Sequence, residues 1–274
     1  MDSSRGYLVI AQNTDDVDYV ELAYALAMSI KLTQTVVTNI CIITDTKLSD
    51  KYEAVFDDVV YLNEDDTAKD SEWRIENKWQ YYKLSPYDKS MILDVDMIFC
   101  SDVSHWWDDC EGHDMVPTLN VNTYRNEQVS STYYRETFRL NTLQNIYTGA
   151  YYFEKNERTE KFFELIKDLF KNWKDVYQVY LPHATPEFVS ADVIYAIAWD
   201  LFYSKKAPDL FLTFTHMKSM VQHWQRLHNT TTVQWTDYIM WYASDDGSIY
   251  IGNWLQSGIL HYVQKDFIYQ NNYL

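Results

Sequence analysis

The stretch "MILDVDMIFCSD", residues 91–102, places two acidic side chains inside an almost wholly apolar run. In a soluble protein such a run predicts a buried β-strand. Asp94 and Asp96 are separated only by Val95, and alternate residues of a strand point to the same side. Burying an ionised carboxylate without a partner is very costly. The sequence therefore requires a positively charged group opposite these two acids.

The residues before this stretch alternate between strand-like and helix-like patterns. Short apolar runs at 7–14, 39–45 and 58–62 predict buried strands, and the segments between them have helical spacing or composition. Residues 71–86 predict a helix that ends at a proline. Strands that alternate with helices form βαβ units, and continuously apolar strands fit a sheet covered on both faces. We therefore expect an α/β fold whose mainly parallel central sheet is flanked by helices.

The second half of the chain has a looser pattern. Apolar runs at 114–121 and 146–156 predict two more strands, and 157–173 and 186–202 predict amphipathic helices. Short strand-like pieces lie within 237–254. Gly and Pro are scarce (6 and 5 of 274 residues) and no linker-like stretch occurs, so one compact domain is expected over the whole chain.

Composition narrows the class of protein. The net charge of −17 disfavours tight binding to a nucleic-acid duplex, because that affinity comes mostly from Lys and Arg. Three cysteines without a C-x-x-C pair indicate neither a disulfide framework nor a zinc site. The N-terminal sequence lacks a signal-peptide pattern, and no apolar run is long enough to span a membrane, so a cytoplasmic protein is expected. The 24 Tyr and 10 Trp residues suit either stacking on bases and sugars or an aromatic core.

A divalent cation is the partner that best fits Asp94 and Asp96. In open α/β sheets ligands bind at the carboxyl ends of the strands, which is where these acids are predicted. Mg²⁺ and Mn²⁺ favour oxygen ligands and often bind through one or two carboxylates together with substrate phosphates. The D-x-D pattern thus indicates a metal with a bound diphosphate. A second D-x-D, at 16–18, precedes a predicted helix and is interpreted as its acidic N-terminus.

Five segments together resemble GT-A-fold glycosyltransferases, with a layout similar to glycosyltransferase family 8, which includes glycogenin and bacterial galactosyltransferases. The most specific segment surrounds the D-x-D. In its general features the chain also resembles glycosyltransferases encoded by large tailed phages. The segments are "YLVIAQNTDD" (7–16), "AYALAMSIKL" (23–32), "SPYDKSMILDVDMIF" (85–99), "NIYTGAYYFEKN" (145–156) and "LHYVQKDF" (260–267).

The resemblance implies a single GT-A domain over 1–274, with a nucleotide-binding half at 1–110 and an acceptor-binding half at 111–274. It implies Mn²⁺ or Mg²⁺ as cofactor and a nucleotide-sugar donor, a UDP-sugar by family habit. Asp94, Asp96 and His261 are the metal ligands that it suggests. It also places Ala11, Val95 and Gly149 near the donor.

Elementary chemistry adds further candidates. If His261 is a metal ligand, its neutral imidazole favours Mn²⁺ over Mg²⁺. The alternative role for His261 is that of a buried structural histidine. Lys265 or Lys78 could neutralise a leaving diphosphate, and the alternatives are a solvated lysine or an ion pair with a nearby acid. Asn13 and Asp15 could bind a base or ribose, or could form a capping turn.

The sequence departs from the family at two places. "LHYVQKDF" keeps His261 but lacks the family's glycine, and its lysine lies closer to the histidine. "VSADVIY" (189–195) aligns with the family's D-Q-D, of which only Asp192 remains. We interpret Asp192 as the candidate catalytic acid that contacts the sugar or stabilises a developing oxocarbenium charge; the alternative is an acid in the first turn of a helix. The family retains the stereochemistry of the sugar, but because of these two departures we do not extend that property to this chain.

The expected activity is transfer of a hexose to an acceptor hydroxyl on a glycan, a protein or a modified DNA base. Two other interpretations stay open. A metal-dependent nucleotidyltransferase also needs paired carboxylates, but neither G-x-x-x-x-G-K-[ST] nor G-x-G-x-x-G occurs. A non-catalytic sugar-binding protein with a degenerate transferase fold is compatible with the two departures.

Overall fold

The computed structural model describes residues 4–62, 68, 74–129, 135–204, 206–208, 212–221, 225 and 233–269. Residues 71–73, the start of the helix predicted over 71–86, lie outside the described part.

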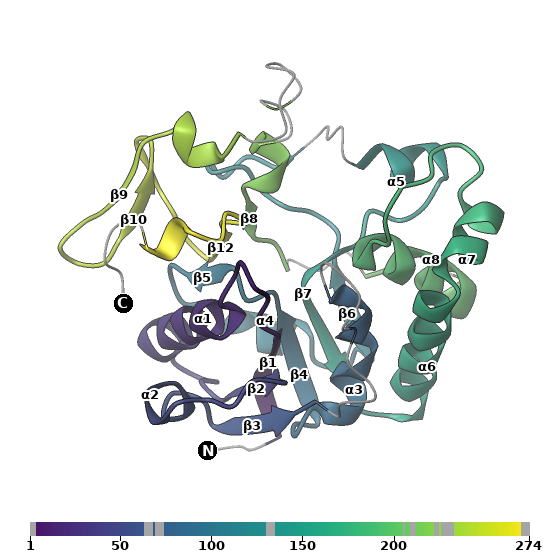
Figure 1. Cartoon of the computed structure of the whole chain (residues 1–274), viewed down its shortest axis with the longest axis horizontal. Helices are drawn as coiled ribbons and strands as arrows, with labels where there is room; N and C mark the ends of the chain where they lie inside the picture. Colours follow the sequence, from purple (N-terminus) through teal and green to yellow (C-terminus); the bar gives the residue numbers. More distant parts are fainter. Residues whose placement is uncertain are drawn as a thin grey trace.

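A six-stranded mixed sheet forms the centre of the molecule (Figure 1). Its first four strands in spatial order are mutually parallel, and β7 pairs antiparallel with both β4 and β6. The α/β fold with a mainly parallel sheet is therefore confirmed. In spatial order the strands are β3 (Asp58–Tyr61), β2 (Ile40–Thr44), β1 (Arg5–Ala11), β4 (Lys89–Leu93), β7 (Tyr147–Glu154) and β6 (Met115–Thr118).

Helices bury both faces of this sheet. Tyr7 and Val9 of β1 pack in one core with α1, whereas Leu8 packs in a second core with α6 and α8. Figure 1 shows α1 on one side of the sheet and α6 with α8 on the other. The helices are α1 (Tyr19–Thr33), α2 (Asp50–Glu53), α3 (Tyr81–Leu84), α4 (His105–Asp109), α5 (Glu136–Leu140), α6 (Glu157–Lys171), α7 (Trp173–Tyr180) and α8 (Ala191–Tyr203), with 3₁₀ turns η2 (Ile75–Gln80), η4 (Trp235–Asp237) and η5 (Phe267–Tyr269).

Local sequence explains the ends of the helices. The Asp18 side chain accepts a hydrogen bond from the Glu21 amide at the start of α1, which confirms the capping interpretation of the D-x-D at 16–18. Asn156 caps α6 together with Thr159 in a reciprocal capping box. The segment before Pro86 forms η2 followed by one turn of α3 rather than one continuous helix. The helix predicted over 186–202 begins only at Ala191.

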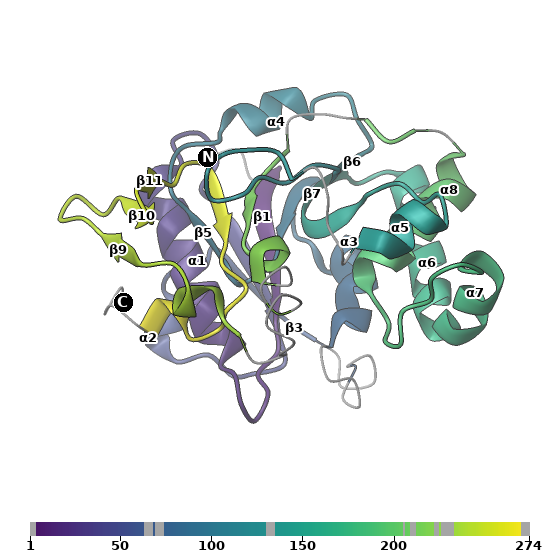
Figure 2. The same ribbon diagram turned by 90° about the horizontal axis from the view of Figure 1, so that it is seen from above.

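Two small three-stranded sheets complete the fold. β5 (Met97–Phe99), β12 (Ile259–His261) and β8 (Thr215–His216) form one, and β9 (Trp241–Ala243), β10 (Ile249–Ile251) and β11 (Trp254–Leu255) form the other. In both views the β9–β11 sheet lies on the α1 side of the molecule, and α5 to α8 lie on the opposite side (Figures 1 and 2).

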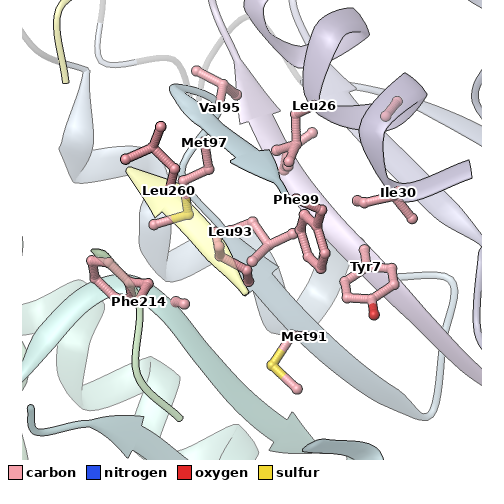
Figure 3. Packing of buried hydrophobic residues seen from close by; sticks show 14 of the residues in the cluster. Tyr7, Leu26, Ile30, Met91, Leu93, Val95, Met97, Phe99, Phe214 and Leu260 are labelled. Atoms are coloured by element: carbon pink, nitrogen blue, oxygen red, sulfur yellow. The ribbon is translucent and has the colours of Figure 1, made fainter. Parts of the chain in front are cut away.

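The opening stretch, 91–102, is not one strand. β4 ends at Leu93 and β5 begins at Met97, so Asp94, Val95 and Asp96 form the connection between two different sheets. The reason is that β4 pairs with β7 whereas β5 pairs with β12, far along the chain. Figure 3 shows the apolar side chains that hold this crossing, with Met97 close to Leu260 and Phe214. The apolar pattern is continuous because both strands are buried.

Within the described ranges, no helix combines the length and the apolar composition needed to cross a membrane.

Aromatic side chains fill much of the core, which confirms that interpretation of their abundance. Phe162 of α6 is fully buried at the centre of one such cluster. Its ring contacts, at centroid distances of 5.4 to 6.2 Å, are Phe163, Tyr195, Trp199, Phe202 and Tyr203. Phe162 therefore joins α6 to α8.

Phe162→Ala is expected to lower the free energy of unfolding by about 3–5 kcal/mol, because it removes a buried ring and leaves a cavity between the helices. Urea unfolding followed by circular dichroism measures this. Leu32→Ala on α1 is the control, since Leu32 is 78% exposed and its truncation should change the unfolding free energy by no more than about 0.5 kcal/mol. Equal losses in the two variants would contradict this account of the core.

Candidate active site

A cleft of about 1100 Å³ opens at the carboxyl ends of β1 and β4 and is lined by residues from both halves of the chain. Gln12 follows β1 and Asp94 follows β4. Asp192 comes from the first turn of α8 and His261 from the end of β12. The cleft therefore lies where an open α/β sheet is expected to bind its ligand.

The acids of the D-x-D and one histidine gather at this cleft. One ligand atom from each of Asp94, Asp96 and His261 lies within 4.8 Å of the other two. The backbone explains the convergence: β12 runs antiparallel to β5, so His261 stands opposite Met97, one residue after Asp96. The Asp94 amide donates to the Gly149 carbonyl of β7 at 2.8 Å, which holds the start of the connection.

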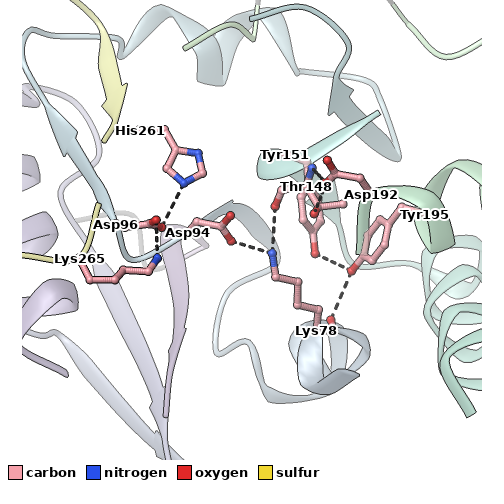
Figure 4. Close-up of polar contacts among 9 residues, drawn as sticks. All are labelled: Lys78, Asp94, Asp96, Thr148, Tyr151, Asp192, Tyr195, His261 and Lys265. Atoms are coloured by element: carbon pink, nitrogen blue, oxygen red, sulfur yellow. Dashed lines mark hydrogen bonds and ion pairs between the residues drawn. The ribbon is translucent and has the colours of Figure 1, made fainter. Parts of the chain in front are cut away.

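Each acid also has a lysine partner (Figure 4). Lys78 Nζ lies 2.7 Å from Asp94 Oδ1, and Lys265 Nζ lies 2.5 Å from Asp96 Oδ2. His261 Nε2 lies 3.1 Å from the other oxygen of Asp96. The positive groups that the sequence demanded opposite the acids are thus side chains of the chain itself. This arrangement differs from the expectation that a metal and its diphosphate alone balance the two acids.

Electrostatics keep Asp96 ionised. Burial by itself raises the pKa of this carboxyl group, but the neighbouring His261 and Lys265 outweigh burial and hold the pKa well below its usual range. Burial alone would lower the pKa of Lys265, and the charge of Asp96 raises it above the ordinary value instead. Asp96 and Lys265 therefore form a fully charged pair at neutral pH.

The residues present fit a divalent cation. Asp94 and Asp96 offer carboxylate oxygens and His261 offers Nε2, a mixed oxygen and nitrogen set that suits Mn²⁺ better than Mg²⁺. Gly149 leaves the space that the imidazole occupies, because a Cβ there would lie 3.3 Å from His261 Nδ1 and 3.0 Å from Met97 Cε. A side chain at 149 would therefore require small shifts of Met97, Phe214 or His261.

His216 lines the cleft, although no motif surrounds it and the sequence indicated only a structural histidine. Parallel pairing of β8 with β12 sets His216 beside His261, with ring centroids 5.1 Å apart. Burial lowers its pKa well below the ordinary value, and the proximity of His261 lowers it further. The cleft therefore contains a neutral imidazole next to the metal-type cluster.

Asp192 lines the same cleft and is firmly held. Its Oδ1 accepts hydrogen bonds from the Thr148 amide at 2.8 Å and hydroxyl at 2.7 Å, and its Oδ2 lies 2.5 Å from Arg135 Nη1. Burial raises the pKa of Asp192, but Arg135 and the Thr148 hydrogen bonds lower it below the ordinary value. Arg135 in turn lies 3.7 and 3.9 Å from the centroids of the Phe138 and Tyr147 rings. Arg135 lies in a polar stretch of the sequence without periodicity, so no local pattern indicated it as a site residue.

A second polar network lies at the ends of β1 and β2. Gln12 Nε2 donates to Asp45 Oδ2 at 2.8 Å, and Asn77 Nδ2 donates to Gln12 Oε1 at 2.5 Å. Arg74 Nη1 lies 3.0 Å from Asp45 Oδ2. Gln12 and Arg74 both line the cleft.

The remaining predicted donor residues have diverse positions. Val95 and Gly149 line the cleft, whereas Ala11, Asn13 and Asp15 are not among the residues that line it in the described part. Ala11 is buried in β1, and Asn13 Oδ1 accepts a hydrogen bond from the Val20 amide at the start of α1. Asp15 is exposed. Donor contacts at these five positions remain predictions.

Comparison with known proteins gives structural likenesses only. No protein-family model matches the sequence, and no curated protein matches it. Among solved structures, the chain is similar to the galactosyltransferase LgtC in complex with donor and acceptor sugar analogues, with 11% identity, a TM-score of 0.46 and coverage of 80% of this chain and 78% of LgtC.

The glycosyltransferase GlyE of Streptococcus pneumoniae TIGR4 is similar at 9% identity and a TM-score of 0.45, over 98% of this chain and 57% of GlyE. Mouse xyloside xylosyltransferase 1 is similar at 8% identity and a TM-score of 0.46, over 71% of this chain and 81% of the mouse chain. All three of these similar structures are of glycosyltransferases.

Arg135→Gln is expected to raise the pKa of Asp192, because the carboxyl group stays buried while its cationic partner is lost. A folded-state pKa below the unfolded value contributes stability above the unfolded pKa, and that stability is lost as pH falls through the folded pKa. The acid-side dependence of the unfolding free energy should therefore weaken in the variant.

Carboxyl carbon NMR titration of Asp192, together with urea unfolding between acidic and neutral pH, measures both effects. Arg139→Gln is the control, since Arg139 lies on α5, the helix that begins directly after Arg135, with its side chain 70% exposed and in an ion pair with Glu136. An Asp192 titration that is the same in all three proteins would show that Arg135 does not set its ionisation.

Proposed function

We propose that this protein is a metal-dependent glycosyltransferase that moves a hexose from a nucleotide-sugar, with a UDP-sugar as donor, to an acceptor hydroxyl. The observation that carries the proposal is the cluster of Asp94, Asp96 and His261 in the large cleft, flanked by two lysines. The sequence resemblance around the D-x-D supports the same reaction class. A nucleotide diphosphate needs this combination of oxygen ligands for a cation and ammonium groups for phosphate charge.

Mn²⁺ or Mg²⁺ held by Asp94, Asp96 and His261 would supply Lewis-acid stabilisation of the leaving nucleoside diphosphate. The chain's own side chains supply the rest of the electrostatics. Lys78 and Lys265 stand on either side of the acids and are placed to neutralise the diphosphate oxygens as the bond to the sugar breaks. The Tyr195 hydroxyl donates a hydrogen bond to the backbone carbonyl of Lys78 at 3.4 Å, which helps to fix the backbone at Lys78.

We propose that Asp192 stabilises positive charge on the sugar. The anomeric carbon becomes cationic as the leaving group departs, as it does in glycoside cleavage. Both oxygens of Asp192 already accept hydrogen bonds, from Thr148 and Arg135, so the carboxylate is fixed in place and remains ionised. Preorganised charge of this kind stabilises a transition state without further reorganisation. We therefore assign Asp192 an electrostatic role toward the sugar.

The nucleoside end of the donor fits the network of Gln12, Asp45, Arg74 and Asn77. Its amide and guanidinium groups suit hydrogen bonding to a base or ribose, and it lies in the 1–110 half, which we propose as the nucleotide-binding half. The 111–274 half supplies Asp192, His261 and Lys265, and we propose that it also binds the acceptor.

Asp94→Asn and Asp96→Asn are expected to abolish a Mn²⁺-dependent rise in melting temperature with UDP-glucose or UDP-galactose, because each loses a charged metal ligand. Ligand binding to the folded state adds directly to its stability, so the melting temperature reports binding. Asp57→Asn is the matched control: it removes the ion pair with Lys31, whose side chain is 29% exposed, and Asp57 does not line the cleft.

The same samples are assayed for the released product. Nucleoside diphosphate is expected; release of pyrophosphate would identify a nucleotidyltransferase instead, and metal-dependent binding without turnover would identify a sugar-binding protein. Unchanged melting shifts in both cleft variants would remove the metal site from the proposal.

A further inference from the structure

The two acids of the metal-type cluster are engaged by cations that belong to the chain. Asp96 is 4% exposed as a residue, and both of its oxygens have partners: His261 Nε2 on Oδ1 and Lys265 Nζ on Oδ2. Asp94 gives Oδ1 to Lys78. Figure 4 shows the two ammonium groups on opposite sides of the acid pair.

These contacts set a cost for any divalent cation. Two carboxylates and two ammonium groups sum to zero net charge, so the cluster lacks the excess negative charge that draws a cation in. A cation coordinated by Asp96 and His261 would lie next to Lys265 and Lys78, and like charges a few ångströms apart repel strongly in a partly buried site. A metal at this place would therefore compete with the lysines for the carboxylate oxygens.

A lysine can make that move because its ammonium group sits on a flexible four-carbon stem. The Lys265 side chain is 30% exposed and faces the cleft, whereas the Lys78 side chain is only 12% exposed and also donates to the Thr148 carbonyl at 3.5 Å. A diphosphate in the cleft offers both lysines new anionic partners. Because the Lys265 side chain is the more exposed of the two, substitution of Lys265 is the more direct test of competition between lysine and metal.

We propose that Lys78 and Lys265 are built-in competitors of the divalent cation, so that metal binds tightly only together with the diphosphate that draws the lysines from the acids. The inference deepens the proposed function and rests on it. Linkage makes the coupling reciprocal: the factor by which diphosphate strengthens metal binding equals the factor by which metal strengthens diphosphate binding. The cleft thereby avoids holding a metal without its substrate.

Calorimetric titration of Mn²⁺ into the full chain tests the proposal, first with Mn²⁺ alone and then with saturating UDP. In the wild type, UDP should strengthen Mn²⁺ binding markedly. Lys265→Met should bind Mn²⁺ alone about tenfold more tightly than the wild type, because a like charge beside the site is gone. The gain from UDP should shrink in the same variant. Lys265→Arg keeps the charge and should restore weak binding of Mn²⁺ alone.

Lys31→Met is the matched control. Lys31 pairs with Asp57 at the same 2.5 Å, and its side chain is 29% exposed, against 30% for Lys265, but it does not line the cleft. The variant has the same change in net charge and should bind Mn²⁺ as the wild type does. Thermal melting of each variant confirms that it is folded before titration.

Two results separate the failure of this inference from that of the proposed function. Tight Mn²⁺ binding that requires Asp96 but is the same in the wild type, Lys265→Met and Lys31→Met would overturn the competition and leave the metal site standing. Mn²⁺ binding that is absent from the wild type and from Lys265→Met, with and without UDP, would overturn both.

Discussion

Two carboxylates that cannot remain unpaired are the constraint on which the cleft depends. Asp94 and Asp96 follow a central strand, and cationic and imidazole groups lie within 3.1 Å of their carboxylate oxygens. Lys78 of η2 lies only 16 residues before Asp94, whereas His261 ends β12 and Lys265 lies in the loop after it. The requirement for charge balance therefore ties the N-terminal sheet to the C-terminal segment.

The topology supplies this convergence through a change of sheet. The chain leaves the six-stranded sheet after Leu93 and joins the small β5–β12–β8 sheet at Met97. Pairing across that small sheet places His261 and His216 beside the acids, and apolar packing of Met97 against Phe214 and Leu260 keeps it in position. Gly149 of β7 leaves the room that this packing needs. The site is thus the junction between two sheets.

Charge is distributed unevenly over the molecule. The chain as a whole carries a net charge of −17, yet five Lys and Arg side chains line the cleft among the described residues. Several are tied to acids in the cleft, as Arg135 is to Asp192 and Lys265 is to Asp96. Such pairs keep the acidic and the basic side chain charged in a partly buried space. A phosphate can replace the acid as the partner of the basic side chain, and a cation or a cationic sugar centre can replace the basic side chain as the partner of the acid. A cleft of this type favours ligands that carry both charges.

The sequence by itself determined the α/β class, the order of the principal strands and helices, and the acids of the cluster, whereas His261 was expected only from the family resemblance. Apolar periodicity and burial cost are local properties, readable wherever 91–102 or 157–173 is inspected. Only the tertiary structure decided that 91–102 is divided between two sheets, that lysines answer the two acids, and that Arg135 and His216 belong to the cleft. Those features depend on contacts between different segments of the chain, such as the pairing of β5 with β12. A local sequence pattern does not indicate which other segment supplies the partner.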